Sequence, residues 1–181
     1  MAAQTYIALL RGLNVGGNNR LAMKELILAF EAAGASKVST YIQSGNLVFD
    51  ASVSVAAKLP GLVSTALEKR HGVRCPVVLR TAKELELAVE KNPYLPAHDV
   101  AFLHVAFLAD TPAPKALAAM DVSRFAPDVL EVVGRELYLM LPNGVGRSKL
   151  TNAYFDSSLK TISTLRNWKT VLALRDLAAA R

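Results

Sequence analysis

The stretch TYIALLRGLNVGGNNRLAMKELILAF, residues 5–30, decides the fold of the first half of the chain. Residues 5–10 are almost all apolar, which predicts a buried strand near the centre of its sheet. A loop rich in glycine and asparagine follows. The apolar residues after it recur at helical spacing, which predicts a helix from about Leu21, capped by Asn18 or Asn19.

The next segments extend this pattern. VSTYIQSGNLVF, residues 38–49, indicates a β-hairpin that turns at the Ser44-Gly45 pair. A helical stretch runs on to His71, and Pro60 within it is an alternative start for the helix. VRCPVVLR alternates as a strand, and the proline inside it favours the edge of a sheet. The resulting order, βαββαβ, is the split βαβ or ferredoxin-like plan.

The second half repeats this order in part. It contains a predicted helix over 82–91, a buried strand over 100–108 and a helix over 114–120. A hairpin then turns at Gly134, and helical segments run from Ser148 to the end. The βαββα order indicates a structural duplication.

We therefore predict an α+β protein of two tandem ferredoxin-like α/β plaits with antiparallel sheets. The first plait is expected over residues 1–92. The second, with the C-terminal helices, is expected over residues 93–181. Pro93 and Pro96 break regular structure at this boundary.

The distribution of charge favours an anionic partner. The net charge is +6 and the isoelectric point is near 9.6. Residues 11–24 hold three basic residues and no acid, and residues 142–181 hold seven basic residues against two acidic ones. Basic charge gathered on two segments attracts phosphates, nucleotides or nucleic acid. Ordinary charge for solubility is the alternative explanation.

Composition narrows the class of protein further. The single cysteine, Cys75, excludes an internal disulfide and a cysteine-rich metal site, and no cofactor is predicted. No apolar run reaches the length of a membrane span, and the first residues lack a secretory signal. We expect a cytoplasmic protein without a membrane partner, and the sequence does not indicate its oligomeric state.

Two glycine-bearing loops are candidate anion sites. RGLNVGG, residues 11–17, lies between a strand and a helix, where backbone N–H groups can hold a phosphate. Its spacing matches neither the dinucleotide fingerprint nor the Walker loop. The alternative is a tight connection whose glycines need positive φ. PNGVGRSKL, residues 142–150, places Arg147 and Lys149 beside Ser148, the expected helix cap, or it forms only a solvated basic turn.

Polar and basic side chains of these loops, the hairpin tip and the closing helical segment make up the predicted ligand-binding set. Its members are Arg11, Asn14, Gly16, Gly17, Arg20, Gln43, Ser44, Asn46, Arg147, Lys149, Arg166 and Asn167. Leu165 and Trp168 share a helical face in the closing segment, so the tryptophan is expected to anchor the core.

Catalytic patterns are weak. The three histidines are scattered, and His104 falls in a predicted buried strand, which favours a core role. No HExxH, paired-cysteine or GxSxG pattern occurs, so neither a zinc hydrolase nor a serine hydrolase is indicated. The sequence does not decide whether the protein is an enzyme.

Three segments, YIALLRGLNVGGNN, TYIQSGNLVF and LRNWKTVLAL, resemble a bacterial family known as domain of unknown function 1697. The matching positions are Arg11, Gly12, Asn14, Gly16, Gly17, Gln43, Ser44, Gly45, Asn46, Arg166, Asn167 and Trp168. The resemblance implies two tandem ferredoxin-like plaits and no established activity. Pro60-Gly61 departs from it and bears on the length of the second helix.

Three hypotheses remain from the sequence. The first is a binder of a phosphate-bearing ligand, either a nucleotide or nucleic acid, through the basic glycine-rich loops. The second is an enzyme acting on a small phosphorylated or carboxylate metabolite in an inter-domain cleft, with Ser44 or His98 as conceivable bases. The third is a structural or partner-binding module without a ligand.

Overall fold

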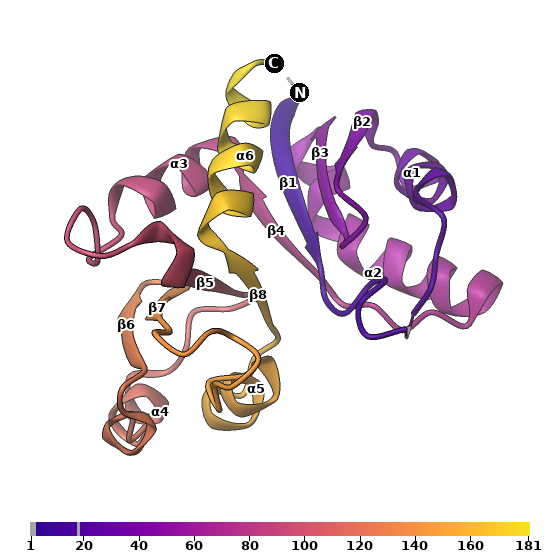
Figure 1. Cartoon of the computed structure of the whole chain (residues 1–181). Coiled ribbons are helices and arrows are strands. Elements are labelled where there is room, and N and C mark those ends of the chain that lie inside the picture. Colours follow the sequence, from indigo (N-terminus) through magenta and orange to yellow (C-terminus); the bar gives the residue numbers. More distant parts are fainter. Residues whose placement is uncertain (1–2, 18) are drawn as a thin grey trace. The chain divides into compact units, whose positions relative to one another are not determined.

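The computed structural model describes residues 3–17 and 19–181 and shows two compact units, each with its own four-stranded antiparallel sheet (Figure 1). The first unit contains the chain up to Glu86 together with Leu174–Arg181, and the second is Leu87–Ala173. The predicted α+β class with two ferredoxin-like plaits is confirmed. In the part of the chain that is described, no helix is long and apolar enough to cross a membrane.

The first unit has the predicted βαββαβ order. Its elements are β1 (Gln4–Leu10), α1 (Met23–Ala32), β2 (Ser36–Tyr41), β3 (Asn46–Ala51), α2 (Val53–His71) and β4 (Val77–Thr81). The strands lie in the order β2-β3-β1-β4, and every neighbouring pair is antiparallel. As expected, β1 is central and β4 forms an edge, with Pro76 just before its first residue.

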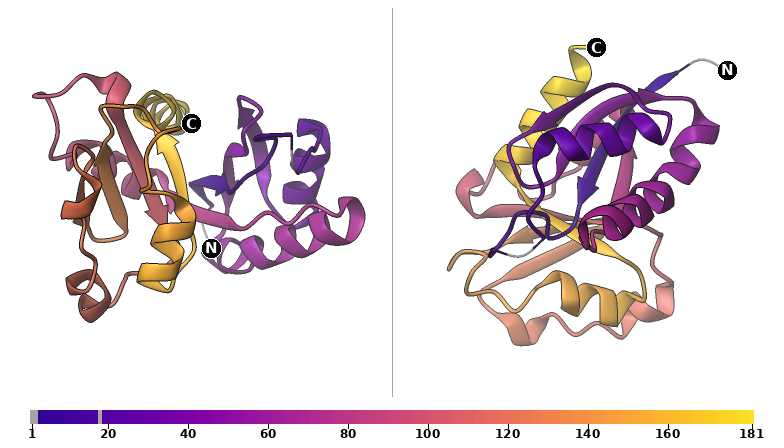
Figure 2. Two further views of the ribbon diagram at one scale, coloured as in Figure 1. Left: turned by 60° about the horizontal axis from the view of Figure 1, so that its bottom comes forward. Right: turned by 90° about the vertical axis from the view of Figure 1, so that its right-hand side faces the viewer.

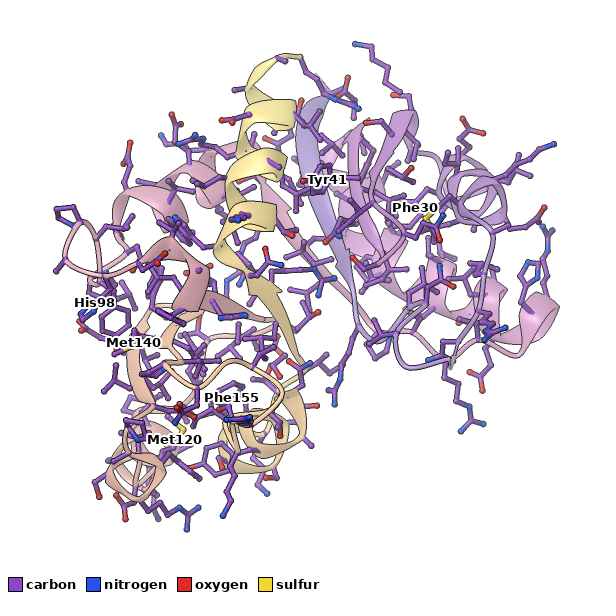
Figure 3. The ribbon with its side chains drawn as sticks, in the orientation of Figure 1. Phe30, Tyr41, His98, Met120, Met140 and Phe155 are labelled. Carbon is purple, nitrogen blue, oxygen red and sulfur yellow. The ribbon has the colours of Figure 1, made fainter. Side chains whose placement is uncertain are left out.

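Helices α1 and α2 cover one face of this sheet (Figure 2). Leu26 of α1 and Leu59 of α2 are buried against it. Phe30 of α1 (Figure 3) meets the ring of Phe49 edge to face, with centroids 5.4 Å apart. Burial of each such side chain stabilises the fold by about 1.5–3 kcal/mol. The apolar residues of the strands and the apolar faces of the two helices therefore pack into one core.

The start of α1 differs from the prediction. The helix begins at Met23, and its N-cap residue Ala22 offers no side-chain hydrogen bond. Asn19 does not cap the helix because it lies three residues before the N-cap, and its Nδ2 donates to the carbonyls of Gly12 and Arg74. Asn18 lies outside the described residues.

Pro60 does not mark the start of α2. The helix runs through it from Val53, capped by Ser52, whose Oγ accepts a hydrogen bond from the Val55 N–H. Proline removes one backbone hydrogen bond from a helix interior. The buried residues Leu59 and Val63 on either side hold the helix against the sheet in spite of that loss.

The second unit repeats the plan. After α3 (Ala82–Glu90) and the short 3-10 helix η1 (Val100–Phe102), its elements are β5 (Leu103–Leu108), α4 (Pro114–Ala118), the 3-10 helix η2 (Ser123–Phe125), β6 (Val129–Val133), β7 (Glu136–Met140), α5 (Asn152–Leu159), β8 (Ser163–Asn167) and α6 (Trp168–Ala179). Its sheet order is β6-β7-β5-β8. Phe155 and Leu159 of α5 pack on a core that includes Ala106 and Leu139 of the sheet.

Two predictions for the second half are wrong, and the start of a third element differs from its predicted position. Residues 163–167 form the edge strand β8 and not a helix, because they pair with β5. The loop after β7 does not lead into a helix at Ser148, since α5 begins at Asn152 and its cap is Thr151, whose Oγ1 accepts from the Tyr154 N–H. The expected strand over 100–108 begins at Leu103, after a 3-10 turn.

The two units also match in local detail. The last strand of each carries a leucine–arginine pair just before its final residue, Leu79-Arg80 in β4 and Leu165-Arg166 in β8, and each arginine donates to the carbonyl of its leucine at 2.8 Å. A polar residue then caps the following helix: Thr81 Oγ1 accepts from the Glu84 N–H, and Asn167 Oδ1 accepts from the Thr170 N–H. The two units therefore share equivalent hydrogen bonds as well as the same order of elements.

Arg181 fastens the end of the chain to the first sheet. Its guanidinium donates to the backbone carbonyls of Lys37 and Val48 and to Ser39 Oγ, at the irregular register between β2 and β3. It also lies 3.7 Å from the buried carboxylate of Asp50.

The carboxylate of Asp50 lies next to two positively charged side chains, Lys37 and Arg181. It accepts a hydrogen bond from Thr5 Oγ1 at 2.9 Å and pairs with Lys37 Nζ at 3.0 Å. Burial of the carboxyl raises its pKa, but the hydrogen bonds from Lys37 and Thr5 and the charges of Lys37 and Arg181 outweigh burial and leave the pKa below its usual value. The folded state therefore favours the ionised carboxylate.

Replacing this carboxylate should lower stability in a pH-dependent way. Asp50→Asn is expected to reduce the free energy of unfolding at pH 7 by about 1–3 kcal/mol, because charged hydrogen bonds are lost. A lowered pKa contributes stability above the unfolded value of about 3.9 and loses it as the pH falls through the folded value. Urea unfolding at several pH values should show the gap between the two proteins narrowing below about pH 4.

Asp176→Asn is the control, since Asp176 pairs with Arg175 at the surface. It should change stability little at any pH. A constant difference between Asp50→Asn and the parent protein from pH 7 down to pH 3 would contradict the account.

Candidate functional site

The connection from β1 to α1 spans residues 11–22, and we call it the glycine loop (Figure 1). Gly12, Gly16 and Gly17 have φ of +69°, +61° and +81°. Asn14 and Asn19 also have positive φ, which asparagine tolerates better than most residues. The expected need for positive φ at the glycines is confirmed.

Asn14 ties the loop together at its middle. Its Oδ1 accepts a hydrogen bond from the Leu21 N–H at 2.8 Å. Its Nδ2 donates to the Leu21 carbonyl at 3.0 Å and to the Gln43 carbonyl at 2.8 Å. One side chain thus joins the end of the glycine loop to the tip of the β2–β3 hairpin, so two of the sequence motifs meet in space.

A second set of bonds holds the loop to the segment before β4. Arg11 donates its N–H to the Pro76 carbonyl at 2.9 Å. Asn19 Nδ2 donates to the Arg74 carbonyl at 3.1 Å, and the buried Cys75 Sγ donates to the Arg11 carbonyl at 3.2 Å. The loop is therefore built into the unit at both ends.

Gly45 of the hairpin tip fits closely against the start of the loop. Its carbonyl accepts from the Leu10 N–H at 2.8 Å, and its φ is +74°. A Cβ at this position would lie 2.8 Å from the Leu10 Cβ and 3.2 Å from the Leu13 Cβ. Only glycine allows the hairpin and the loop to approach this closely.

The glycine loop and the hairpin tip enclose an open hollow of about 430 Å³, which we call the loop hollow. It is lined by Asn14, Gly17, Arg20, Leu21, Ala22 and Gln43. Four of these belong to the predicted ligand-binding set. Arg20 and Gln43 are exposed, and since Asn14 directs its amide into the loop, they supply the polar side chains free to meet a ligand.

The electrostatics of the loop hollow favour an anion. Among residues 3–17 and 19–181, no group forms a hydrogen bond or an ion pair with the Arg20 side chain. The hollow also borders Ala22, the N-cap of α1, and the N-terminal end of a helix carries partial positive charge. The acid of that first turn, Glu25, lies 3.8 Å from His71.

The remaining predicted residues of the first unit stand around the hollow without lining it. Gly16 is exposed in the loop. Arg11 is half-buried and bonded through its backbone. Asn46 is fully buried, and its Nδ2 donates to the Tyr41 carbonyl and to Ser44 Oγ. The side chains of Asn46 and Ser44 therefore stabilise the turn.

The predicted residues of the second unit fall in two places. Arg147 and Lys149 line a smaller hollow in that unit. Arg166 of β8 donates to Thr164 Oγ1 and to the Leu165 carbonyl, and Asn167 caps α6. Trp168 is buried, as expected of a core anchor.

Sequence reasoning missed the other members of the smaller hollow, which include Arg124, Phe125, Asp128 and Asn143. The β6–β7 hairpin separates residues 124–128 from residues 143–149 along the chain, and the fold brings the two groups together. The adjacent arginine and phenylalanine were the one local signal, and such a pair alone does not indicate a site.

The titratable groups of the core do not form a reactive centre. His104 of β5 is buried with Nδ1 3.3 Å from the Phe102 carbonyl. Burial lowers its pKa, and the contact with the backbone carbonyl offsets only part of that effect. Within the described ranges, no three His, Cys, Asp or Glu side chains gather where they could hold a metal ion.

A family model described as "Protein of unknown function (DUF1697)" matches residues 3–138. The chain belongs to this family. The matched part includes the glycine loop and the hairpin tip, whereas the segment around Trp168 lies beyond it. The DUF1697 assignment confirms the resemblance and brings no activity with it.

A solved structure supports the fold over the whole length. The conserved bacterial protein SP0830 from Streptococcus pneumoniae is similar at a TM-score of 0.75 and 24% identity, covering 98% of this chain and 99% of that one. This likeness shows the shared fold. Comparison with functionally curated proteins gave no match.

The close approach at Gly45 gives a stability test. Gly45→Ala should lower the free energy of unfolding by about 2–4 kcal/mol, because a left-handed residue gains a Cβ and that Cβ overlaps Leu10. Gly16→Ala is the matched control: its φ is also positive, but nothing lies within 4 Å of the added Cβ. It should cost about 1 kcal/mol. Equal losses in urea unfolding would show that the hairpin tip does not press on the loop.

Proposed function

We propose that this DUF1697 protein binds a phosphate-bearing ligand, a nucleotide or nucleic acid, at the loop hollow of its first unit. The observation that carries the proposal is the shared wall of the hollow. The glycine loop, which carries Arg20 and ends at Ala22 just before α1, lines it together with Gln43 of the hairpin tip, and the two segments are far apart in the sequence.

The donors at the hollow suit phosphate oxygens. The Arg20 guanidinium presents N–H groups in a plane that matches a phosphate and forms charge-assisted hydrogen bonds. The N-terminal end of α1 behind Ala22 adds partial positive charge at the wall of the hollow. Gln43 adds a neutral amide that can discriminate between ligands.

The length of the loop supports a role beyond connection. In the second unit, the equivalent link from β5 to α4 takes five residues, 109–113. The glycine loop takes twelve, and it uses two asparagine side chains to hold its shape. A connection of the same topology therefore does not need this length or these glycines.

The size of the hollow fits a ligand larger than a bare ion. Sites for small molecules and cofactors enclose about 300–1,000 Å³, and the loop hollow encloses about 430 Å³. Its open form lets a nucleotide, or one nucleotide of a strand, project into solvent. Lys24 on the following turn adds positive charge nearby.

Binding of labelled single-stranded RNA, followed by fluorescence anisotropy at low salt, tests the proposal, with ATP as the competitor. Arg20→Ala combined with Gln43→Ala should weaken binding by about tenfold or more, since a charge-assisted contact is lost. It should also reduce the slope of log K against log salt by about 0.7, the value for one phosphate contact on a single strand.

Arg70→Ala is the matched control, because Arg70 is an exposed cation on α2 in the same unit. It should leave affinity within about twofold of the parent. If ATP displaces the RNA, the site takes nucleotides as well as strands. Failure of both RNA and ATP to bind at low salt, or equal effects of the two variants, would overturn the assignment.

A further inference from the structure

The smaller hollow in the second unit encloses about 180 Å³ and gathers positive charge, and we call it the basic hollow. Its functional side chains are Arg124, Phe125, Asp128, Asn143, Arg147 and Lys149. They come from η2 with the turn after it, and from the loop between β7 and α5. Three cations therefore face one carboxylate in a small space.

Arg124 is positioned by aromatic rings. Its guanidinium carbon lies 4.9 Å from the centroid of Phe125 and 5.7 Å from that of Tyr154. The two rings meet edge to face at 4.9 Å. Stacking on a ring engages the face of the guanidinium and leaves its N–H groups free at the edge. No described residue accepts a hydrogen bond from them, although Asp121 lies within electrostatic reach.

The loop that carries the other two cations has a defined shape. Gly144 has φ of +80° and donates its N–H to the Leu141 carbonyl. The Arg147 N–H returns to the Gly144 carbonyl at 3.1 Å, and Ser148 Oγ accepts from the N–H of the buried Leu150. Successive turns thus hold the backbone on both sides of the basic residues.

The side chains of Arg147 and Lys149 are exposed at the hollow. In the part of the chain that the structure describes, neither has an ion-pair partner. Like charges brought together repel each other, and a bound anion would remove that repulsion. The hollow therefore presents cationic donors from two segments of the chain, an arrangement that suits an oxyanion.

Asp128 and Asn143 limit what that oxyanion can be. A carboxylate at the wall repels a bare anion but accepts a hydrogen bond from a hydroxyl group. The Asn143 amide can both donate to and accept from a hydroxyl. The volume, about 180 Å³, is below the range of about 300–1,000 Å³ for drug-sized ligands and cofactors.

We propose that the basic hollow binds a small hydroxylated phosphomonoester. Arg124, Arg147 and Lys149 hold its phosphate, and Asp128 and Asn143 contact its hydroxyl groups. The site is separate in sequence from the loop hollow, and the inference does not rest on the function proposed above. It gives the second unit a ligand of its own.

The test uses the full chain labelled with ¹⁵N and sn-glycerol 3-phosphate as the probe, with inorganic phosphate as the comparison. Addition of glycerol 3-phosphate should shift the backbone amide signals of residues 124–126, 128 and 143–149, since Pro127 has no backbone N–H. Inorganic phosphate should bind several-fold more weakly, because it lacks the hydroxyl groups that Asp128 and Asn143 contact.

Substitutions at exposed positions should leave the fold intact, so a change in binding can be assigned to the lost side chain. Arg147→Ala with Lys149→Ala should weaken glycerol 3-phosphate binding by at least about tenfold, and Lys115→Ala, an exposed cation on α4, is the matched control. Asp128→Asn should raise affinity for inorganic phosphate and narrow the preference for glycerol 3-phosphate. Arg124→Lys keeps the charge but should lose affinity, since lysine cannot present a planar edge of N–H groups.

Several outcomes would overturn the proposal. Shifts confined to the loop hollow, abolished by Arg20→Ala but unaffected by Arg147→Ala with Lys149→Ala, would contradict it while leaving the function of the first unit in place. Equal affinity for inorganic phosphate would exclude the hydroxylated ligand. Binding of RNA but not of glycerol 3-phosphate at the basic hollow would assign the hollow to nucleic acid instead.

Discussion

The Asn14 carboxamide bonds to both backbone groups of Leu21 and to the carbonyl of Gln43, and the candidate site depends on these three bonds. They close a loop in which Asn14, Asn19 and three glycines take positive φ, a conformation that costs free energy at Asn14 and Asn19 unless other interactions offset it. Because Asn14 supplies the bonds from inside the loop, Arg20 and Gln43 remain directed at the hollow. Preorganisation of this kind lowers the entropy cost of binding.

The same fold carries two different surfaces. Each unit has a four-stranded sheet of one order, and each closes its hairpin on the end of its first strand: Leu10 N–H bonds to Gly45, and Leu108 N–H bonds to Arg135. On this shared plan, the first unit adds a long loop after its first strand. The second unit keeps that link short and gathers its cations around the turn after η2 and the loop before α5. The duplication thus fixes the core and leaves the connections free to diverge.

Much of the fold could be predicted because, in the first unit, the spacing of apolar residues and the turn-forming residues indicate the same helices and strands. β1 is central and apolar, Ser44-Gly45 turns a hairpin, and Pro76 marks an edge, so the sheet order follows. β8 could not be predicted because its five residues run directly into α6, and the spacing of Leu165 and Trp168 is also helical. A short edge strand is recognised by its pairing with β5, and pairing is not visible in a single sequence.

The candidate site was predictable in part for the same reason. Asn14, Gly17, Arg20 and Gln43 stand in loops next to predicted elements, and hairpin closure brings those loops together. The roles of Asn14 and Asn46 could not be assigned, since an amide that holds a turn and one that holds a ligand have the same sequence signal. Arg124 was missed because nothing in its neighbourhood along the chain shows that Arg147 lies beside it.

The hydrogen bonds of Asn14 hold the glycine loop in shape without a ligand. Amide hydrogen exchange measured by NMR on the free protein tests this at Leu21, whose N–H donates to Asn14 Oδ1. The account predicts slow exchange at Leu21 in the parent protein, and exchange at least about tenfold faster in Asn14→Ala, since loss of about 1.4 kcal/mol of protection corresponds to a factor of ten. If the Leu21 N–H of the parent exchanges as fast as that of the exposed Gly16, the loop is not preorganised and the account is contradicted.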